Sequence, residues 1–258
     1  MYNYIIAVDI GNTNTHIGLV YCSSRGILSL DIFPSMDIDT RLVDSIVSLS
    51  ISMKHAAPVP VVVCSVIKSI EARYNSILCK LIESPVLWLK YSPALPVVVN
   101  YEDPYILGVD RLANFFYGYD VFNGKNLIII DAGTAIKIDY LKNGREFFGG
   151  VILPGLATQL HSLHDKTEQL PLVNVEEVGL EFPGLSTQSC ILGGVRLGIA
   201  GSLSFLVKKI KQHFNEDAII LATGGSWKYL QEYMQFEFEF IPELTLVGCA
   251  LYNRHVSI

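Results

Sequence analysis

A short motif occurs twice in the chain, and this repetition constrains the fold more than any other feature of the sequence. The chain reads VDIGNT at residues 8–13 and IDAGTA at residues 130–135, and nearly half of its 258 residues separate the two copies. Each copy lies where an apolar run ends at an Asp and a Gly, which predicts a strand turning into a hairpin. Helical patterns follow both hairpins. We therefore expect an α/β fold of two similar halves, residues 1–112 and 113–258, facing each other across a cleft.

The spacing of apolar residues predicts alternating strands and helices in both halves. Strands are expected at Tyr4–Val8, His16–Tyr21, Ile27–Ile32, Val59–Cys64, Val86–Leu89, Val97–Val99, Leu127–Ile130, Ile136–Tyr140, Arg145–Phe148, Ile219–Ala222 and Glu237–Ile241. Helices are expected at Asp39–Met53, Ser69–Ile82, Asp110–Tyr119, Leu156–Asp165, Ser186–Phe214, Trp227–Met234 and Pro242–Arg254, with a break in the long one at Gly193–Gly194.

Composition excludes several classes of protein. Half of the residues are hydrophobic and 17% are charged, which predicts a large core and leaves room for an apolar subunit interface. The net charge of −6 argues against a nucleic-acid-binding protein. Five scattered cysteines without a CxxC pair predict neither a disulfide framework nor a zinc ribbon. The first residues lack the basic region of a signal peptide, and the apolar runs are shorter than a membrane span, so we expect a cytoplasmic protein that does not contact a membrane.

The repeated motif has the chemistry of a phosphate-binding loop. Its glycine lets the backbone approach a ligand closely, and successive N–H groups can surround an anion. Because the carboxylate of Asp9 would repel a phosphate, its position predicts an intervening Mg²⁺ ion. The alternative is an ordinary hairpin turn, for each copy taken alone. The chain contains neither GxxxxGK[ST] nor GxGxxG, which excludes a P-loop enzyme and a dinucleotide-binding fingerprint.

Two further segments are rich in glycine or charge. GVDRLAN at 108–114 places Asp110 and Arg111 at the start of a predicted helix, where they serve either a ligand or helix capping and solvation. GGVILPG at 149–155 predicts close backbone contact, either with a ligand or, as the better prediction, within a tight hairpin. TGG at 223–225 either approaches a nucleotide or forms a simple turn.

Together these segments resemble type III pantothenate kinases over essentially the whole chain. The resemblance rests on DIGNT at 9–13, Tyr101, GVDR at 108–111, DAGTA at 131–135, GGVILPG at 149–155 and LST at 185–187, in this order. These kinases belong to the acetate and sugar kinase, Hsp70 and actin superfamily. The resemblance therefore implies two duplicated ribonuclease-H-like halves, as in actin-like ATPases, flanking a nucleotide cleft.

The resemblance also implies roles for individual residues. The ATP phosphates would contact Asp9, Ile10, Gly11, Asn12, Thr13, Asn14, Thr15 and His16, with Thr134 adding a contact to ATP. Pantothenate would contact Tyr101, Gly108, Val109, Asp110, Arg111 and Thr187. Asp110 would accept the proton of the pantothenate hydroxyl, and Asp131 would hold the monovalent cation, K⁺ or NH₄⁺, that the family needs. The family resemblance further implies ATP with Mg²⁺ and a homodimer whose acceptor pocket is partly closed by the neighbouring subunit.

Two positions depart from the family pattern. Lys137 stands where many relatives have a small hydroxyl residue, close to the expected cation site, and His16 stands where Lys or an apolar residue is commoner. Two alternative functions remain at this point. One is a non-catalytic relative acting as a transcription accessory factor, and the other is a kinase acting on an acetate, a sugar or an N-acetyl-sugar.

Overall fold

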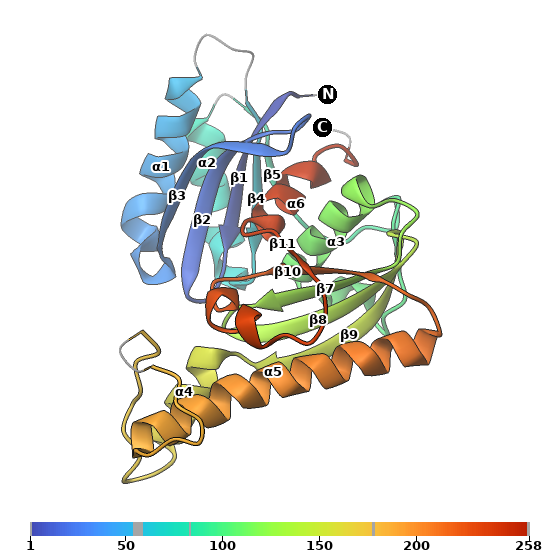
Figure 1. Cartoon of the computed structure of the whole chain (residues 1–258). Helices are drawn as coiled ribbons and strands as arrows, with labels where there is room; N and C mark the ends of the chain where they lie inside the picture. Colours follow the sequence, from blue (N-terminus) through green and yellow to red (C-terminus); the bar gives the residue numbers. More distant parts are fainter. Residues whose placement is uncertain (1, 54–58, 83, 177–178, 257–258) are drawn as a thin grey trace. The chain divides into compact units, whose positions relative to one another are not determined.

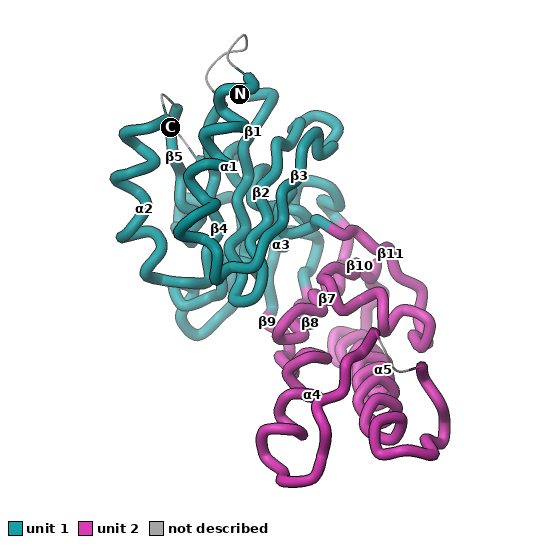
Figure 2. Tube along the Cα trace, turned by 90° about the vertical axis from the view of Figure 1, so that its left-hand side faces the viewer, with its two compact units in different colours: residues 1–124, 141–148, 243–258 teal, residues 125–140, 149–242 magenta. Residues whose placement is uncertain are grey.

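The chain divides into two compact units, each described by itself (Figure 2). The computed structural model describes residues 2–53, 59–82, 84–176 and 179–256. Unit 1 comprises Met1–Gly124, Leu141–Phe148 and Glu243–Ile258, and unit 2 comprises Lys125–Tyr140 and Gly149–Pro242. These bounds follow spatial contacts and not the internal repeat, so the division into halves 1–112 and 113–258 stays a prediction.

The sheet of unit 1 is an antiparallel meander extended by two parallel strands (Figure 1). Its strands are β1 (Tyr4–Ile10), β2 (Asn14–Tyr21), β3 (Gly26–Pro34), β4 (Val61–Ser65) and β5 (Val86–Trp88), in the order β3-β2-β1-β4-β5. β1 pairs antiparallel with β2 and parallel with β4. Its residues Ile5–Val8 are fully buried, as expected for a central strand covered on both faces.

Helices cover this sheet because their apolar residues recur at helical spacing. They are α1 (Ile38–Ser52), α2 (Lys68–Leu81), α3 (Val109–Val121) and α6 (Leu244–Tyr252), with the 3₁₀ turns η1 (Ser35–Asp37) and η2 (Pro104–Ile106). α1 buries Ile38, Leu42 and Ile46, which are four residues apart and therefore share one face. α6 is buried almost throughout and packs against β1, β2, β4 and α3.

The second sheet repeats the strand order of the first. Its strands are β7 (Leu127–Ala132), β8 (Ala135–Lys142), β9 (Glu146–Pro154), β10 (Ile219–Thr223) and β11 (Glu239–Phe240), with β6 (Val98–Val99) beside β9. The order β11-β10-β7-β8-β9 is that of the first sheet read from its fifth strand, and β10 is parallel to β7 as β4 is to β1. The repeated order confirms the predicted α/β fold with duplicated ribonuclease-H-like halves.

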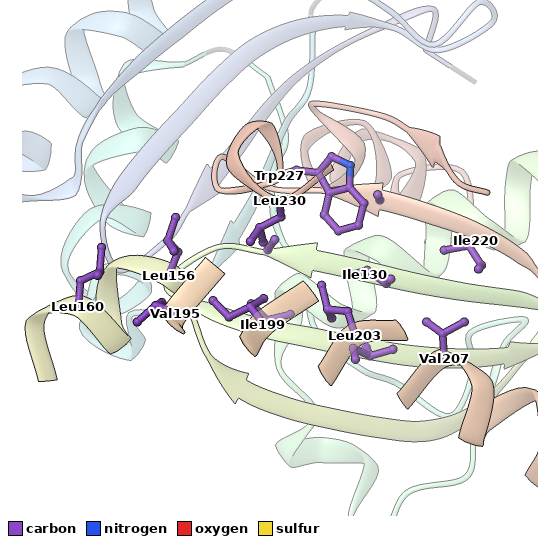
Figure 3. Close-up of a cluster of buried hydrophobic side chains, with 14 of the residues drawn as sticks. Ile130, Leu156, Leu160, Val195, Ile199, Leu203, Val207, Ile220, Trp227 and Leu230 are labelled. Carbon is purple, nitrogen blue, oxygen red and sulfur yellow. The ribbon is translucent and has the colours of Figure 1, made fainter. Parts of the chain in front are cut away.

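The core of unit 2 lies between its strands and two helices, α4 (Leu156–Asp165) and α5 (Thr187–Phe214) (Figure 3). Ile199 and Leu203 of α5 are buried with Ile130 of β7 and Ile220 of β10. By length and composition α5 could cross a membrane, contrary to the expectation that no apolar run is long enough. Half of its apolar window is buried in the protein, and its buried Ile, Leu and Val residues belong to this core.

Two other predicted elements differ in the structure. The long helix α5 continues through Gly193–Gly194, because each glycine costs only about 1 kcal/mol relative to alanine in a helix that packs along its length. The helix predicted over Trp227–Met234 is instead a pair of 3₁₀ turns, η3 (Trp227–Tyr229) and η4 (Gln231–Tyr233). Residues three apart are aligned in a 3₁₀ turn, and this brings Trp227 and Leu230 together into the core.

Candidate active site

The first motif forms the tip of the β1–β2 hairpin in unit 1. Asp9 lies one residue before the end of β1 and is paired with His16 across the hairpin. The backbone N–H of Gly11 donates to the carbonyl of Asn14 at 3.0 Å, which closes the turn. Residues 12–14 have exposed side chains at this tip. The arrangement suits a loop that presents backbone N–H groups and small polar side chains to an anion.

Ser35 of η1 holds this loop in place through hydrogen bonds, a role that the sequence did not reveal. Its backbone N–H donates to the carbonyl of Thr13 at 2.8 Å, and its hydroxyl donates to the carbonyl of Gly11 at 2.7 Å. The hydroxyl of Thr15 lies 2.9 Å from the same hydroxyl. Thr15 is fully buried, so its side chain braces the loop from inside.

His16 forms an ion pair with Glu243, the residue that precedes α6. The imidazole Nδ1 lies 2.8 Å from the Glu243 carboxylate, and both side chains are largely buried. Burial by itself lowers the pKa of His16, but the hydrogen bond to Glu243 and the negative charges of Glu243 and Asp9 outweigh it, so the pKa is raised. The base of the loop therefore favours a cationic imidazole close to Asp9.

The second candidate segment of unit 1 begins α3. Gly108 is the N-cap residue, and the carboxylate of Asp110 accepts the backbone N–H of Arg111 at 2.8 Å. A Cβ on Gly108 would lie 2.6 Å from this carboxylate oxygen, so the carboxylate would have to shift if another residue stood at this position. The carboxylate therefore lies beside the positive end of the helix dipole. Asp110 is half-buried, as expected of a carboxylate that must reach a ligand.

Arg111 lies among aromatic rings. Its guanidinium is 5.6 Å from the ring centroid of Tyr101 and 5.1 Å from that of Phe147, and the two rings meet edge to face. The side chain is 6% exposed, which contradicts the alternative of a solvated arginine on the helix surface. Cation–π contacts of this kind orient a guanidinium whose donors can bind a carboxylate in a bidentate manner.

Helix α6 connects the loop of the first hairpin with α3. Immediately after Glu243, the hydroxyl of Thr245 donates to the side-chain oxygen of Asn114 on α3 at 2.8 Å. A Cβ on Gly248 would lie 2.0 Å from the carbonyl oxygen of Ala113, so the two helices can approach this closely only at a glycine. One short helix therefore fixes both His16 and the helix that carries Asp110.

The second motif forms the tip of the β7–β8 hairpin in unit 2. The backbone N–H of Gly133 donates to the carbonyl of Ala135 at 3.2 Å. Thr134, at the tip, is exposed, and its carbonyl accepts hydrogen bonds from Gly155 N–H at 2.9 Å and from the hydroxyl of Thr158 at 2.6 Å. The start of α4 thus holds this turn in place.

Three glycines of the segments 149–155 and 223–225 make close backbone contacts within unit 2. A Cβ on Gly150 would lie 2.0 Å from the carbonyl oxygen of Ile138, which confirms the prediction of a tight hairpin. A Cβ on Gly155 would lie 2.1 Å from the carbonyl oxygen of Gly133. Gly224 has a φ of +96° and packs against the backbone of Ala132, so TGG forms a turn behind the second motif.

The carboxylate of Asp131, one residue before the end of β7, is paired with the ammonium of Lys137 on β8. The two groups are 2.7 Å apart, and the side chains are only 13% and 15% exposed. This is a largely buried ion pair inside the second motif. It occupies the position where the sequence predicted a monovalent cation.

The predicted site residues fall into two sets. Unit 1 contains Asp9–His16, Tyr101 and Gly108–Arg111, and unit 2 contains Asp131, Thr134 and Thr187. Thr187 is exposed at the first position of α5, after the N-cap Ser186. Sequence reasoning missed Ser35 and Glu243, whose contacts join residues far apart in the chain; a serine in a turn and an acid before a helix were their only signals.

The comparison with protein families gives one consistent description. A family model described as type III pantothenate kinase matches residues 5–209, which include both hairpins and α3. A type III pantothenate kinase from Persephonella marina (strain DSM 14350 / EX-H1) is 30% identical over 254 residues, covering 97% of this chain and 99% of that protein.

Solved structures resemble the chain in fold. A protein from Campylobacter jejuni, provisionally assigned to the Baf family of transcriptional activators, has a TM-score of 0.61 at 19% identity, covering 98% of this chain and 100% of its own. An inorganic polyphosphate/ATP-glucomannokinase from Arthrobacter sp. strain KM has a TM-score of 0.52 at 14% identity, covering 98% and 100%. At these identities the likeness concerns the fold alone.

Proposed function

Because the chain belongs to the type III pantothenate kinase family, we propose that it transfers the γ-phosphoryl group of ATP to the hydroxyl of pantothenate. This reaction is the first step of coenzyme A biosynthesis. The observation that carries the proposal is the start of α3, where Gly108 leaves room for the Asp110 carboxylate and Arg111 lies between aromatic rings. The family match covers this segment together with both hairpin loops.

Asp9 fits a Mg²⁺ ion that accompanies ATP. Among residues 2–53, 59–82, 84–176 and 179–256, no group of three or more His, Cys, Asp or Glu side chains could hold a metal. Mg²⁺ in kinases is commonly bound through one or two carboxylates and the substrate phosphates, which is consistent with a single carboxylate beside the loop. Bound Mg²⁺ would neutralise charge on the phosphates. Residues 10–16 bind and orient the phosphates from this loop, and Thr134 adds a contact from the second one.

Asp110 accepts the proton of the attacking hydroxyl. An ionised carboxylate at a helix start needs little rearrangement to take up a proton, and a loose phosphoryl-transfer transition state requires only modest help from a base. Arg111 binds the carboxylate of pantothenate through its guanidinium, which Tyr101 keeps oriented. Gly108, Val109 and Thr187 complete the acceptor contacts that the family resemblance implies.

The protein acts as a homodimer in this proposal, and α5 supplies the supporting observation. Gly194, Gly198 and Gly201 lie on one exposed face of the helix, with open space around each position where a Cβ would be, and Phe205 on the same face is 58% exposed. Exposed glycines inside a helix are unfavourable by about 1 kcal/mol each relative to alanine. Close packing against a second copy would offset that cost.

The monovalent-cation site and the cytoplasmic location belong to the same proposal. The resemblance implies a K⁺ or NH₄⁺ ion at Asp131, and in this chain the Lys137 ammonium already lies on that carboxylate. A cytoplasmic location agrees with an enzyme of coenzyme A biosynthesis, and α5 contributes to the core of unit 2.

An ADP-release assay over a panel of acceptors tests the proposal against its alternatives. The panel contains pantothenate, acetate, a hexose and an N-acetyl-hexosamine, each with ATP and Mg²⁺. We expect ADP release with pantothenate alone, and mass spectrometry should show a product one phosphate heavier. Preference for another acceptor would make the protein a different kinase of the superfamily. ATP binding without turnover on any acceptor would favour a regulatory protein.

A further inference from the structure

The two hairpins place a basic residue at the same position. In the first, the Gly11–Asn14 hydrogen bond closes the turn and His16 is paired with Asp9. In the second, the Gly133–Ala135 hydrogen bond closes the turn. Two residues back from Gly133 is Asp131 and two residues on from Ala135 is Lys137, so these two residues lie opposite each other as Asp9 and His16 do. Residues opposite each other on antiparallel strands project to the same face with Cβ atoms about 5 Å apart.

The basic side chains of the two hairpins have different partners. His16 is bound to Glu243, outside its hairpin, at 2.8 Å. Lys137 is bound to Asp131 itself at 2.7 Å, and both side chains are about seven-eighths buried. The duplicated acidic position of the second hairpin thus has a cation supplied by its own chain.

A dissolved K⁺ or NH₄⁺ ion does not fit the Asp131 carboxylate in this arrangement. The Lys137 ammonium lies at contact distance with the same single charge, and a second cation beside it would be repelled at low local dielectric constant. Chemically, a lysine side chain is an alkylated ammonium ion. Because Lys137 belongs to the same chain as Asp131, its effective concentration at the carboxylate does not depend on the salt in the medium.

We propose that the Lys137 ammonium serves as the monovalent cation of this enzyme, so that its activity does not depend on K⁺ or NH₄⁺. The inference rests on the proposed kinase function and concerns the same site. Lys137 acts by holding the charge and position of Asp131 in the second loop, and it is therefore a positioning residue.

The first test is the salt dependence of the unaltered protein. Pantothenate phosphorylation is measured in buffers in which Tris, Na⁺, K⁺ or NH₄⁺ is the only monovalent cation, at equal ionic strength. We expect the four rates to agree within about twofold, since the internal ammonium supplies the charge in every buffer. Strong activation by K⁺ or NH₄⁺ would overturn the inference. Absence of turnover in all four buffers would overturn the proposed function instead.

The second test removes the ammonium. In Lys137→Met, turnover in Na⁺ or Tris should fall by roughly 10²- to 10³-fold, the usual loss when one preorganised charge is removed from a site. Added K⁺ or NH₄⁺ should restore a large part of it. Lys137→Gln keeps a hydrogen-bond donor for Asp131 and should show the same rescue if the Met variant does not fold. Lys166→Ala, which removes an exposed positive charge in the same unit, is the matched control and should respond to no cation.

A readout without turnover separates this role from a purely structural one. The melting temperature of each substrate-free protein is recorded in Na⁺ and in K⁺. We expect K⁺ to raise the melting temperature of Lys137→Met and Lys137→Gln, because the ion would bind the Asp131 carboxylate in place of the ammonium. The melting temperatures of the unaltered protein and of Lys166→Ala should be the same in both salts. Variants that lose activity without rescue, and whose melting is the same in both salts, would make the ion pair structural only and refute the proposal.

Discussion

Substitution of Ser35 by alanine should both loosen the loop at the tip of the β1–β2 hairpin and lower the stability of the protein. Ser35 is 6% exposed, and its hydroxyl donates to the carbonyl of Gly11 at 2.7 Å and lies 2.9 Å from the hydroxyl of Thr15, which is fully buried. Each hydrogen bond contributes about 0.5–1.5 kcal/mol net, and a buried hydroxyl left without a partner costs about 1–3 kcal/mol. We therefore expect Ser35→Ala to lower the free energy of unfolding by about 2–3 kcal/mol.

The size of this effect can be read in two assays. At about 2–4 °C per kcal/mol for a chain of this size, the melting temperature should fall by roughly 4–12 °C. Because the loop also loses its attachment, the KM for ATP should rise several-fold, while the KM for pantothenate stays nearly constant. Ser52→Ala removes an exposed serine hydroxyl that donates to a backbone carbonyl, and it serves as the control with little change expected.

A double-mutant cycle with Thr15→Val tests the physical reason. Thr15→Val alone removes one hydrogen bond, and in the double variant no hydroxyl is left buried without a partner. The combined destabilisation should therefore be smaller than the sum by about 1 kcal/mol or more. Additive losses, or an unchanged KM for ATP in Ser35→Ala, would refute the bracing role of Ser35.

Three other predictions follow from the site. Asp110→Asn should lower kcat by roughly 10²- to 10⁴-fold with ATP affinity retained, and turnover within a few-fold of the unaltered enzyme would reduce Asp110 to an orienting group. Because the pKa of His16 is raised, its pair with Glu243 should contribute its full stability below about pH 6.5 and lose it as the pH rises through the raised pKa. The difference in melting temperature between the unaltered protein and Glu243→Gln should therefore shrink toward high pH. A constant difference would disprove the pair. Gly198→Leu should convert a species of twice 28.6 kDa into a monomer in light scattering, whereas an unchanged mass would exclude this helix face as the interface.

The sequence was most informative where one feature occurs twice. The echo of Asp9–Thr13 in Asp131–Ala135 predicted duplicated hairpins, and the sheets do share one strand order. Strands with continuous apolar runs were also predictable, since burial on both faces leaves no polar positions. The paired 3₁₀ turns at Trp227 and Leu230 were not, because apolar residues three apart fit either kind of helix.

The supporting contacts of the site depend on residues that no local pattern connects. His16 and Glu243 are 227 positions apart, and Glu243 has the appearance of an ordinary residue before a helix. Ser35 follows a strand end, where serine is common in any turn. Such partners become apparent only when the topology brings β2 next to α6 and η1 next to the loop.

The two departures from the family pattern correspond to each other in position. His16 and Lys137 occupy equivalent positions of the duplicated hairpins, each across from the acidic residue that lies one position before the end of the first strand. In the first hairpin, the basic residue is bound to Glu243, and we propose that the Asp9 carboxylate binds a divalent cation together with the phosphates. In the second hairpin, Lys137 neutralises Asp131 directly. Under our proposals, the first loop holds a metal–phosphate cluster and the second loop carries its own monovalent charge.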